Sequence, residues 1–284
     1  MIKLDNVSKR YKKGSYFSKE YIDALKGVSL FIEKGEHVGI VGESGAGKST
    51  LCRILSLLEL PSSGSIKIDG EYITKRNIKN KRGRVGIVFQ DPATSINPLY
   101  KVIDAIKEAT DDFERIFHIC SLVSLKEELL YKYPSQLSGG ELQRAAIVRA
   151  LCMEKADYIV FDEFTSALDI STQVKIVSNL VEINRQRRYG FVFVSHDIRL
   201  VNFLSDRIYV IYKGEIVEEL VGLKDAKHPY TKSLINGETA KRNDSGNGCS
   251  FYEFCPYAKE ICRNKKPEFL RKRNSAVRCF LYYD

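Results

Sequence analysis

A glycine-rich segment near the start of the chain constrains its fold more than any other feature. Residues Gly42-Glu43-Ser44-Gly45-Ala46-Gly47-Lys48-Ser49, followed by Thr50, fit the pattern G-x-x-x-x-G-K-[ST]. The apolar run 37–41 before them is typical of a short buried strand, and an apolar helical pattern begins directly after them. Strand, turn and helix together predict a phosphate-binding loop (P-loop), whose backbone N–H groups surround an anion. Lys48 is expected to contact the β- and γ-phosphates of a nucleotide, and the Ser49 hydroxyl to bind Mg²⁺.

Composition indicates a globular protein without a membrane span. The chain has 284 residues, of which 44% are hydrophobic and 29% charged, enough for a sizeable core in one or two domains. Its apolar runs are shorter than the ~18 residues of a spanning helix, and its N-terminus lacks the plan of a signal peptide. We therefore expect a cytoplasmic location, where cysteines are reduced or bound to metal.

The net charge of +9 raises the question of an anionic partner. Such a charge permits binding to nucleic acid or to a membrane surface, but it also arises from basic residues spread over solvated faces. For most of the chain we favour the second interpretation. We expect no nucleic-acid partner.

The order of strand and helix patterns predicts an α/β fold with additional layers. Residues 2–7 alternate as an edge strand does, and similar segments at 27–32 and 65–70 suggest an antiparallel β subdomain attached to a parallel core. Between 99 and 133 the pattern is helical without strand candidates, which predicts a helical subdomain at about 92–152. The fold class is thus a P-loop NTPase core with an antiparallel β subdomain, a helical subdomain and a Cys-rich C-terminal extension.

Four polar residues follow predicted buried strands, at the sheet edge where open α/β sheets bind ligands. Asp162 is suited to hold Mg²⁺, and Glu163 to orient a water for attack on the γ-phosphate. Gln90 would sense both Mg²⁺ and that water. His196 would contact the γ-phosphate and support the charge that develops during transfer. Taken singly, Gln90 or His196 is more often an ordinary polar residue, but its position after a strand beside the P-loop favours a role.

The segment Leu137-Ser138-Gly139-Gly140-Glu141-Leu142-Gln143 resembles the signature motif of ATP-binding cassette (ABC) ATPases. This resemblance covers roughly residues 1–235 and implies the family's motifs. They are a Walker A motif at Gly42–Ser49, a Q-loop at Gln90, a Walker B motif at Tyr158–Asp162 with catalytic Glu163, a D-loop at Ser166–Asp169 and a switch His196. The domains expected from it are an ABC ATPase domain at 1–235 and an extension at 236–284.

The resemblance also implies a composite site. Two cassettes would enclose two ATP molecules, each between one P-loop and the partner's Ser138, Gly139 and Gly140, supplied in trans from a helix N-terminus. An upstream aromatic should stack on adenine. Tyr11 matches the family position best, and Tyr16 and Tyr21 are weaker alternatives.

Three separate segments resemble the ATPases of oligopeptide, dipeptide and nickel importers: residues 90–98, 228–234 and the Cys-bearing tail 248–279. The resemblance implies integral-membrane permease subunits, a second ATPase that is a paralogue or this chain itself, and an extracellular or periplasmic binding protein. It places the chain at the cytoplasmic face of the membrane, energising uptake of peptides or nickel chelates. Residues 91–105 would help form a groove for a permease helix.

The tail holds four of the seven cysteines, Cys249, Cys255, Cys262 and Cys279, in a segment with little apolar content of its own. A bound metal would stabilise such a segment, and both Zn²⁺ and a [4Fe–4S] cluster accept four thiolates. The resemblance implies an iron–sulfur cluster, which we favour over zinc; four unligated thiols are the third possibility. Cys52, Cys120 and Cys152 lie in apolar helical patterns and are expected in the core.

A different class of function is a non-transport ATPase that acts on nucleic acid or ribosomes. Chromosome-type cassettes carry a long coiled-coil insertion between the P-loop and the Walker B motif. Only about 110 residues separate the two motifs here, which suits the helical domain of the ABC family and is too short for such an insertion. Ribosome-type members carry two cassettes, and this chain has one. We therefore favour transport.

Overall fold

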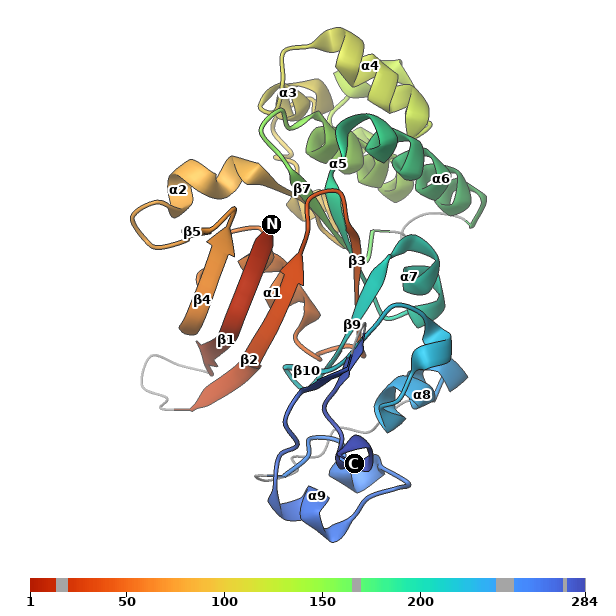
Figure 1. Cartoon of the computed structure of the whole chain (residues 1–284). Helices are drawn as coiled ribbons and strands as arrows, with labels where there is room; N and C mark the ends of the chain where they lie inside the picture. The colour runs from red at the N-terminus through yellow and green to blue at the C-terminus, as the bar shows by residue number, and fades with distance from the viewer. Residues whose placement is uncertain (14–19, 165–169, 239–247, 273–274, 284) are drawn as a thin grey trace.

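The computed structural model describes residues 1–13, 20–164, 170–238, 248–272 and 275–283, which form two β-sheets flanked by helices (Figure 1). The larger sheet has the order β11-β12-β10-β9-β3-β8-β7-β6, and the smaller one β2-β1-β4-β5. The strands of the larger sheet are β3 (His37–Val41), β6 (Val85–Val88), β7 (Tyr158–Asp162), β8 (Gly190–Ser195), β9 (Arg207–Tyr212), β10 (Glu215–Leu220), β11 (Leu270–Lys272) and β12 (Ser275–Val277). Those of the smaller sheet are β1 (Ile2–Lys12), β2 (Tyr21–Ile32), β4 (Ser63–Ile68) and β5 (Glu71–Tyr72).

The larger sheet has a parallel centre, formed by β9, β3, β8, β7 and β6. Strands β7 and β8 are buried throughout, because both faces of the parallel centre are covered. The carboxyl ends of β3, β7 and β8 lie at one edge, with Val41 opposite Ser195 and Asp162 opposite Val194. The P-loop follows β3 at this edge. The predicted α/β core is therefore present.

The smaller sheet is antiparallel, as predicted, but the predicted position of its first strand at the edge of the sheet is wrong. The alternation of residues 2–7 suggests an edge strand, whereas β1 lies between β2 and β4 and pairs with both. Alternation reports only that one face of a strand is buried. The two partners of β1 come from later parts of the chain, so residues 2–7 alone do not indicate how many neighbouring strands they will pair with.

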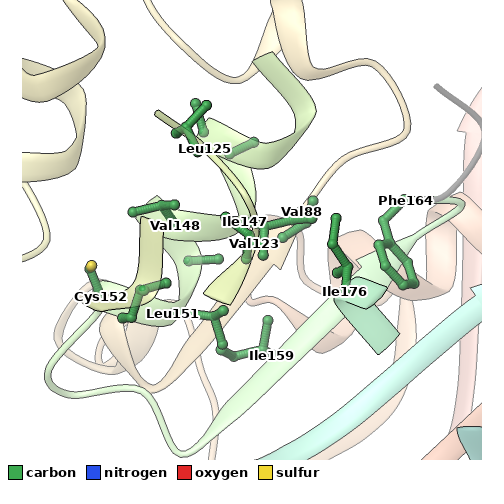
Figure 2. Close-up of a cluster of buried hydrophobic side chains, with 14 of the residues drawn as sticks. Val88, Val123, Leu125, Ile147, Val148, Leu151, Cys152, Ile159, Phe164 and Ile176 are labelled. Atoms are coloured by element: carbon green, nitrogen blue, oxygen red, sulfur yellow. The ribbon is translucent and has the colours of Figure 1, made fainter. Parts of the chain in front are cut away.

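Nine helices lie around the sheets in the described part of the chain (Figure 1). Their bounds are α1 (Lys48–Leu55), α2 (Ile78–Lys81), α3 (Val102–Lys107), α4 (Phe113–Leu122), α5 (Gly139–Cys152), α6 (Ile170–Arg187), α7 (Ile198–Leu204), α8 (Pro229–Asn236) and α9 (Glu260–Asn264). Helices α3 to α6 gather at the top of Figure 1 and share a core with β6 and β7, part of which Figure 2 shows. Cys120 and Cys152 belong to this core and Cys52 to that under the smaller sheet, which confirms the prediction for these three.

The C-terminal segment is attached to the larger sheet. Strand β12 pairs antiparallel with β10, matching Val277 to Glu218. Phe251 packs in a third core together with Tyr212 of β9 and Tyr230 of α8. The segment thus uses apolar surface of the main sheet in place of a core of its own. No helix among the described ranges combines the length and apolar character needed to cross a membrane.

Candidate functional site

The P-loop has a shape that two of its glycines make possible. Gly47 is the N-cap of α1 with φ 107°, and a Cβ there would lie 2.6 Å from the Ala24 carbonyl oxygen. A Cβ on Gly42 would lie 2.2 Å from the Ile211 carbonyl oxygen. Residues with side chains would therefore collide with neighbouring strands at both positions. The glycines let the loop turn tightly between β3 and α1.

Lys48 is buried, with 5% of its side chain exposed, and faces back over the loop. Its Nζ donates hydrogen bonds to the carbonyl oxygens of Gly42 at 2.8 Å and Glu43 at 3.1 Å. Ser44, Gly45 and Ser49 are exposed, Glu43 and Gly47 are partly exposed, and Gly42, Ala46 and Thr50 are buried. The loop thus presents an open surface at the start of α1, where helix N–H groups favour an anion.

Asp162 lies beside the start of α1 and is 5% exposed. Burial raises its pKa, and the charge of Glu163 raises it further; a hydrogen bond with Ser49, the charge of Lys48 and a hydrogen bond with Cys52 oppose the shift. A carboxylate and a hydroxyl in contact are oxygen ligands of the kind that Mg²⁺ prefers. Ser49 and Asp162 therefore fit the predicted magnesium site. The sequence pattern did not indicate Cys52 as a neighbour of this carboxylate.

Glu163 is the point at which the predicted catalytic residues meet. Its Oε1 lies 3.4 Å from Lys48 Nζ and 3.5 Å from His196 Nδ1, and its Oε2 accepts a hydrogen bond of 2.9 Å from Gln90 Nε2. Gln90, Glu163 and His196 follow the ends of β6, β7 and β8, and Lys48 is the first residue of α1, after the loop that follows β3. A carboxylate held in this way between a P-loop lysine and two polar groups can orient and deprotonate a water.

The backbone of Glu163 is in a conformation that L residues seldom adopt. Its φ is +46°, and its N–H donates to the Val194 carbonyl at 2.9 Å. Strained positions of this kind cost of order 1–3 kcal/mol and cluster at functional sites. The turn directs the carboxylate toward the P-loop at the strand end.

The residues of the signature motif stand apart from the P-loop within one chain. Ser138 is the N-cap of α5 and forms a capping box with Glu141, whose N–H donates to Ser138 Oγ at 3.3 Å. Ser138 and Gly139 are exposed, and Gly140 is partly exposed. In the described part of the chain, no hydrogen bond or ion pair joins these residues to the P-loop. The helix N-terminus thus faces outward and is free to serve an anion held by another molecule.

Tyr11, the residue predicted to stack on adenine, already makes contacts within the chain. The Tyr11 hydroxyl donates to Glu59 Oε2 at 2.7 Å, and Lys9 Nζ lies 5.2 Å from its ring centroid. Of the alternatives, Tyr21 is 58% exposed, and Tyr16 lies outside the described residues. The predicted D-loop, 166–169, also lies outside them. The role of Tyr11 stays a prediction.

The four tail cysteines influence one another electrostatically. Burial raises the pKa of the Cys249 thiol to about 11, and the thiols of Cys262, Cys279 and Cys255 add to the shift. The sulfur atoms of Cys249, Cys255 and Cys279 accept N–H bonds from Phe251, Tyr257 and Leu281 respectively, each two residues further on. Across the described ranges, however, no three His, Cys, Asp or Glu side chains are gathered so that they could hold a metal ion. The donors suit a soft metal in kind, and the iron–sulfur prediction stays open.

Comparisons with known proteins find relatives that are ATP-binding subunits of transporters. Residues 25–166 match the family described as ABC transporter. The chain is 34% identical to the di/tripeptide transport ATP-binding protein DppF of Pseudomonas aeruginosa, over 94% of this chain and 92% of that one. It is also 34% identical to the oligopeptide transport ATP-binding protein AppF of Bacillus subtilis, over 92% and 90%. Among solved structures, the dimeric ATP-binding cassette MJ0796 with bound ADP and phosphate is 34% identical with a TM-score of 0.69, over 77% of this chain and 97% of that one.

Proposed function

The chain belongs to the ABC transporter family, and from this premise we propose that it is the ATP-hydrolysing subunit of an importer that takes up peptides. ATP hydrolysis by this family supplies the energy for transport. The observation that carries the proposal is Glu163, held between Lys48, Gln90 and His196 at the open P-loop. The relatives that match over 92–94% of the chain are named for peptide transport.

In the proposed reaction the P-loop and Lys48 bind the phosphates of ATP, and Glu163 orients and deprotonates the attacking water. A Mg²⁺ ion held by Ser49, Asp162 and Gln90 would neutralise charge on the β- and γ-phosphates. His196 Nδ1 and Lys48 Nζ are both near Oε1 of Glu163. From this position His196 can contact the γ-phosphate and stabilise the negative charge that develops on it during transfer.

The site is completed by a second cassette, a paralogue or this chain itself. Ser138, Gly139 and Gly140 face outward and do not reach their own P-loop, so they serve the ATP of the partner. ATP thereby joins two cassettes, and hydrolysis releases them. The partners of this cycle are integral-membrane permease subunits and, through them, an external binding protein. The chain would lie at the cytoplasmic face of the membrane.

The surface proposed for the permease is the segment 91–105, which follows Gln90. Its Leu99 is 80% exposed and Tyr100 53% exposed. Exposed apolar side chains in the segment that follows a catalytic residue suit a contact that transmits closure of the dimer. Because Gln90 holds Glu163, a shift of this segment would reach the catalytic carboxylate directly.

The cysteines Cys249, Cys255, Cys262 and Cys279 are proposed to hold a [4Fe–4S] cluster, with zinc as the alternative metal. What supports this is the donor set of four thiols and the backbone N–H groups directed at three of the sulfurs. Such N–H groups stabilise thiolate charge. The cluster would tie the tail together and has no part in the hydrolytic steps.

The test is transport by the reconstituted complex. The chain is co-purified with its permease and partner ATPase, inserted into liposomes and supplied with binding protein and labelled peptide. Uptake that needs ATP is expected, and a nonhydrolysable analogue should not support it. Uptake of a nickel chelate in place of peptide would show that the proposed cargo is wrong. An ATPase activity that responds to DNA or ribosomes and to no transport substrate would overturn the proposal in favour of the non-transport class.

A further inference from the structure

One peptide group of the P-loop is held from both sides. The carbonyl of Gly42 accepts a hydrogen bond of 2.8 Å from Lys48 Nζ, and the N–H of the same peptide group, on Glu43, donates to the Tyr230 hydroxyl at 3.0 Å. Because a peptide group is planar, rotating it would break both bonds together. Bonds arranged in a chain also polarise one another. Tyr230 therefore fixes the orientation of the carbonyl on which Lys48 rests.

Tyr230 is itself held rigidly. It lies on α8, far along the chain from the P-loop, and is fully buried. Its ring packs against Tyr212, with centroids 4.4 Å apart, and against Phe251, with centroids 5.5 Å apart. Tyr212 and Phe251 also pack on each other, so the three rings form one cluster. The Tyr230 hydroxyl has little freedom to move away from the loop.

Phe251 connects this cluster to the C-terminal cysteines. Its ring faces Tyr230, and its backbone N–H donates to the sulfur of Cys249, two residues earlier. Contacts thus run from Cys249 through Phe251 and Tyr230 to Glu43 of the P-loop.

We propose that Tyr230 is a positioning residue for the P-loop and that Phe251 of the C-terminal segment keeps it in place, so that this segment tunes the affinity for ATP. The proposal rests on ATP binding at the P-loop and is independent of the cargo and of any metal on the cysteines. A loop whose 42–43 peptide is fixed in advance pays less ordering cost when it closes on the phosphates.

The test compares two tyrosines that differ in one respect. Tyr230→Phe removes the hydroxyl that accepts from Glu43 and keeps the ring. Tyr212→Phe is the matched control, because the buried Tyr212 hydroxyl has no hydrogen-bond partner within the described ranges. In the purified full-length chain, Tyr230→Phe should raise the Kd for Mg·ATP about two- to tenfold, the range of one neutral hydrogen bond. The KM for ATP should rise by a similar factor, with a smaller change in kcat.

Amide hydrogen exchange supplies a second readout. Tyr230→Phe should speed exchange in the peptide that contains residues 42–47 and leave the core strands unchanged, whereas Tyr212→Phe should change neither. Phe251→Leu should weaken ATP binding in the same direction, and combined with Tyr230→Phe it should add less than its separate effect, because both act through one bond.

Equal Kd values and equal exchange for the two tyrosine variants would overturn the proposal. So would faster exchange across the whole chain in Tyr230→Phe, which would show general destabilisation in place of positioning. If the effects of Phe251→Leu and Tyr230→Phe on ATP binding were fully additive, the C-terminal segment would have no role in positioning Tyr230. A chain that shows the expected Tyr230 dependence but energises no peptide uptake would refute the proposed cargo and support this inference.

Discussion

Replacing Glu163 by Gln should change ATP binding and ATP hydrolysis in opposite directions. The substitution keeps the size of the side chain and an oxygen that can accept from Gln90, but it removes the negative charge. In the structure that charge lies 3.4 Å from Lys48 Nζ, the group that is expected to contact the phosphates when ATP binds. Glu163 thus competes with ATP for Lys48 before it serves in hydrolysis.

The size of the binding effect follows from this contact. Two unit charges 3.4 Å apart attract by about 1 kcal/mol at the permittivity of water and by about 5 kcal/mol at an effective value of 20. The side chains of Lys48 and Glu163 are only 5% and 16% exposed, so the cost of desolvating both charges offsets much of the larger figure. Taking about 1 kcal/mol as the net competition, Glu163→Gln should tighten ATP binding about fivefold.

Hydrolysis should fall by about 100- to 10,000-fold, because an amide cannot take the proton of the attacking water. With ATP bound and not consumed, the variant should accumulate as a closed dimer. Fluorescent ATP titration, phosphate release and size-exclusion chromatography with Mg·ATP measure the three effects. Glu71→Gln, which removes an exposed carboxylate on β5, is the control and should match the wild type in all of them. Turnover within tenfold of wild type would remove Glu163 from the role of base, and unchanged or weaker ATP binding would refute the competition for Lys48.

Three further predictions concern other parts of the molecule. Lys48→Ala should abolish ATP binding in a titration, since it removes the buried charge at the P-loop; retained binding and turnover would undermine the phosphate site. Anaerobically purified protein should show a broad visible absorbance that disappears in Cys249→Ser, whereas colourless protein with stoichiometric zinc would replace the cluster by zinc. Burial lowers the pKa of His228 to about 3, so between about pH 3 and pH 6.5 the unfolded chain binds more protons at this residue. Acidification through this window should therefore lower the free energy of unfolding in chemical denaturation, and less so in His228→Gln; parallel pH profiles of the two proteins would contradict this reasoning.

The sequence alone determined the parts of this protein that are written in consecutive residues. The P-loop, the Asp162–Glu163 pair and the Ser138 signature each combine a local pattern with a chemistry, and their presence on a strand end or helix start follows from the flanking apolar runs. The α/β core could be predicted for the same reason, because β7 and β8 are continuous apolar runs. The family was recognisable from these segments, and the comparisons confirm it.

Only the tertiary structure decided which distant residues touch. The sheet order brings together the ends of β3, β6, β7 and β8, so that Lys48, Gln90 and His196 converge on one carboxylate. It also makes β1 an interior strand and places the Tyr230 hydroxyl on a P-loop amide. The physical reason is that strand pairing and ring packing depend on how well the surfaces of two distant segments fit together. The residues of one segment alone therefore do not indicate which other segment will pack against it.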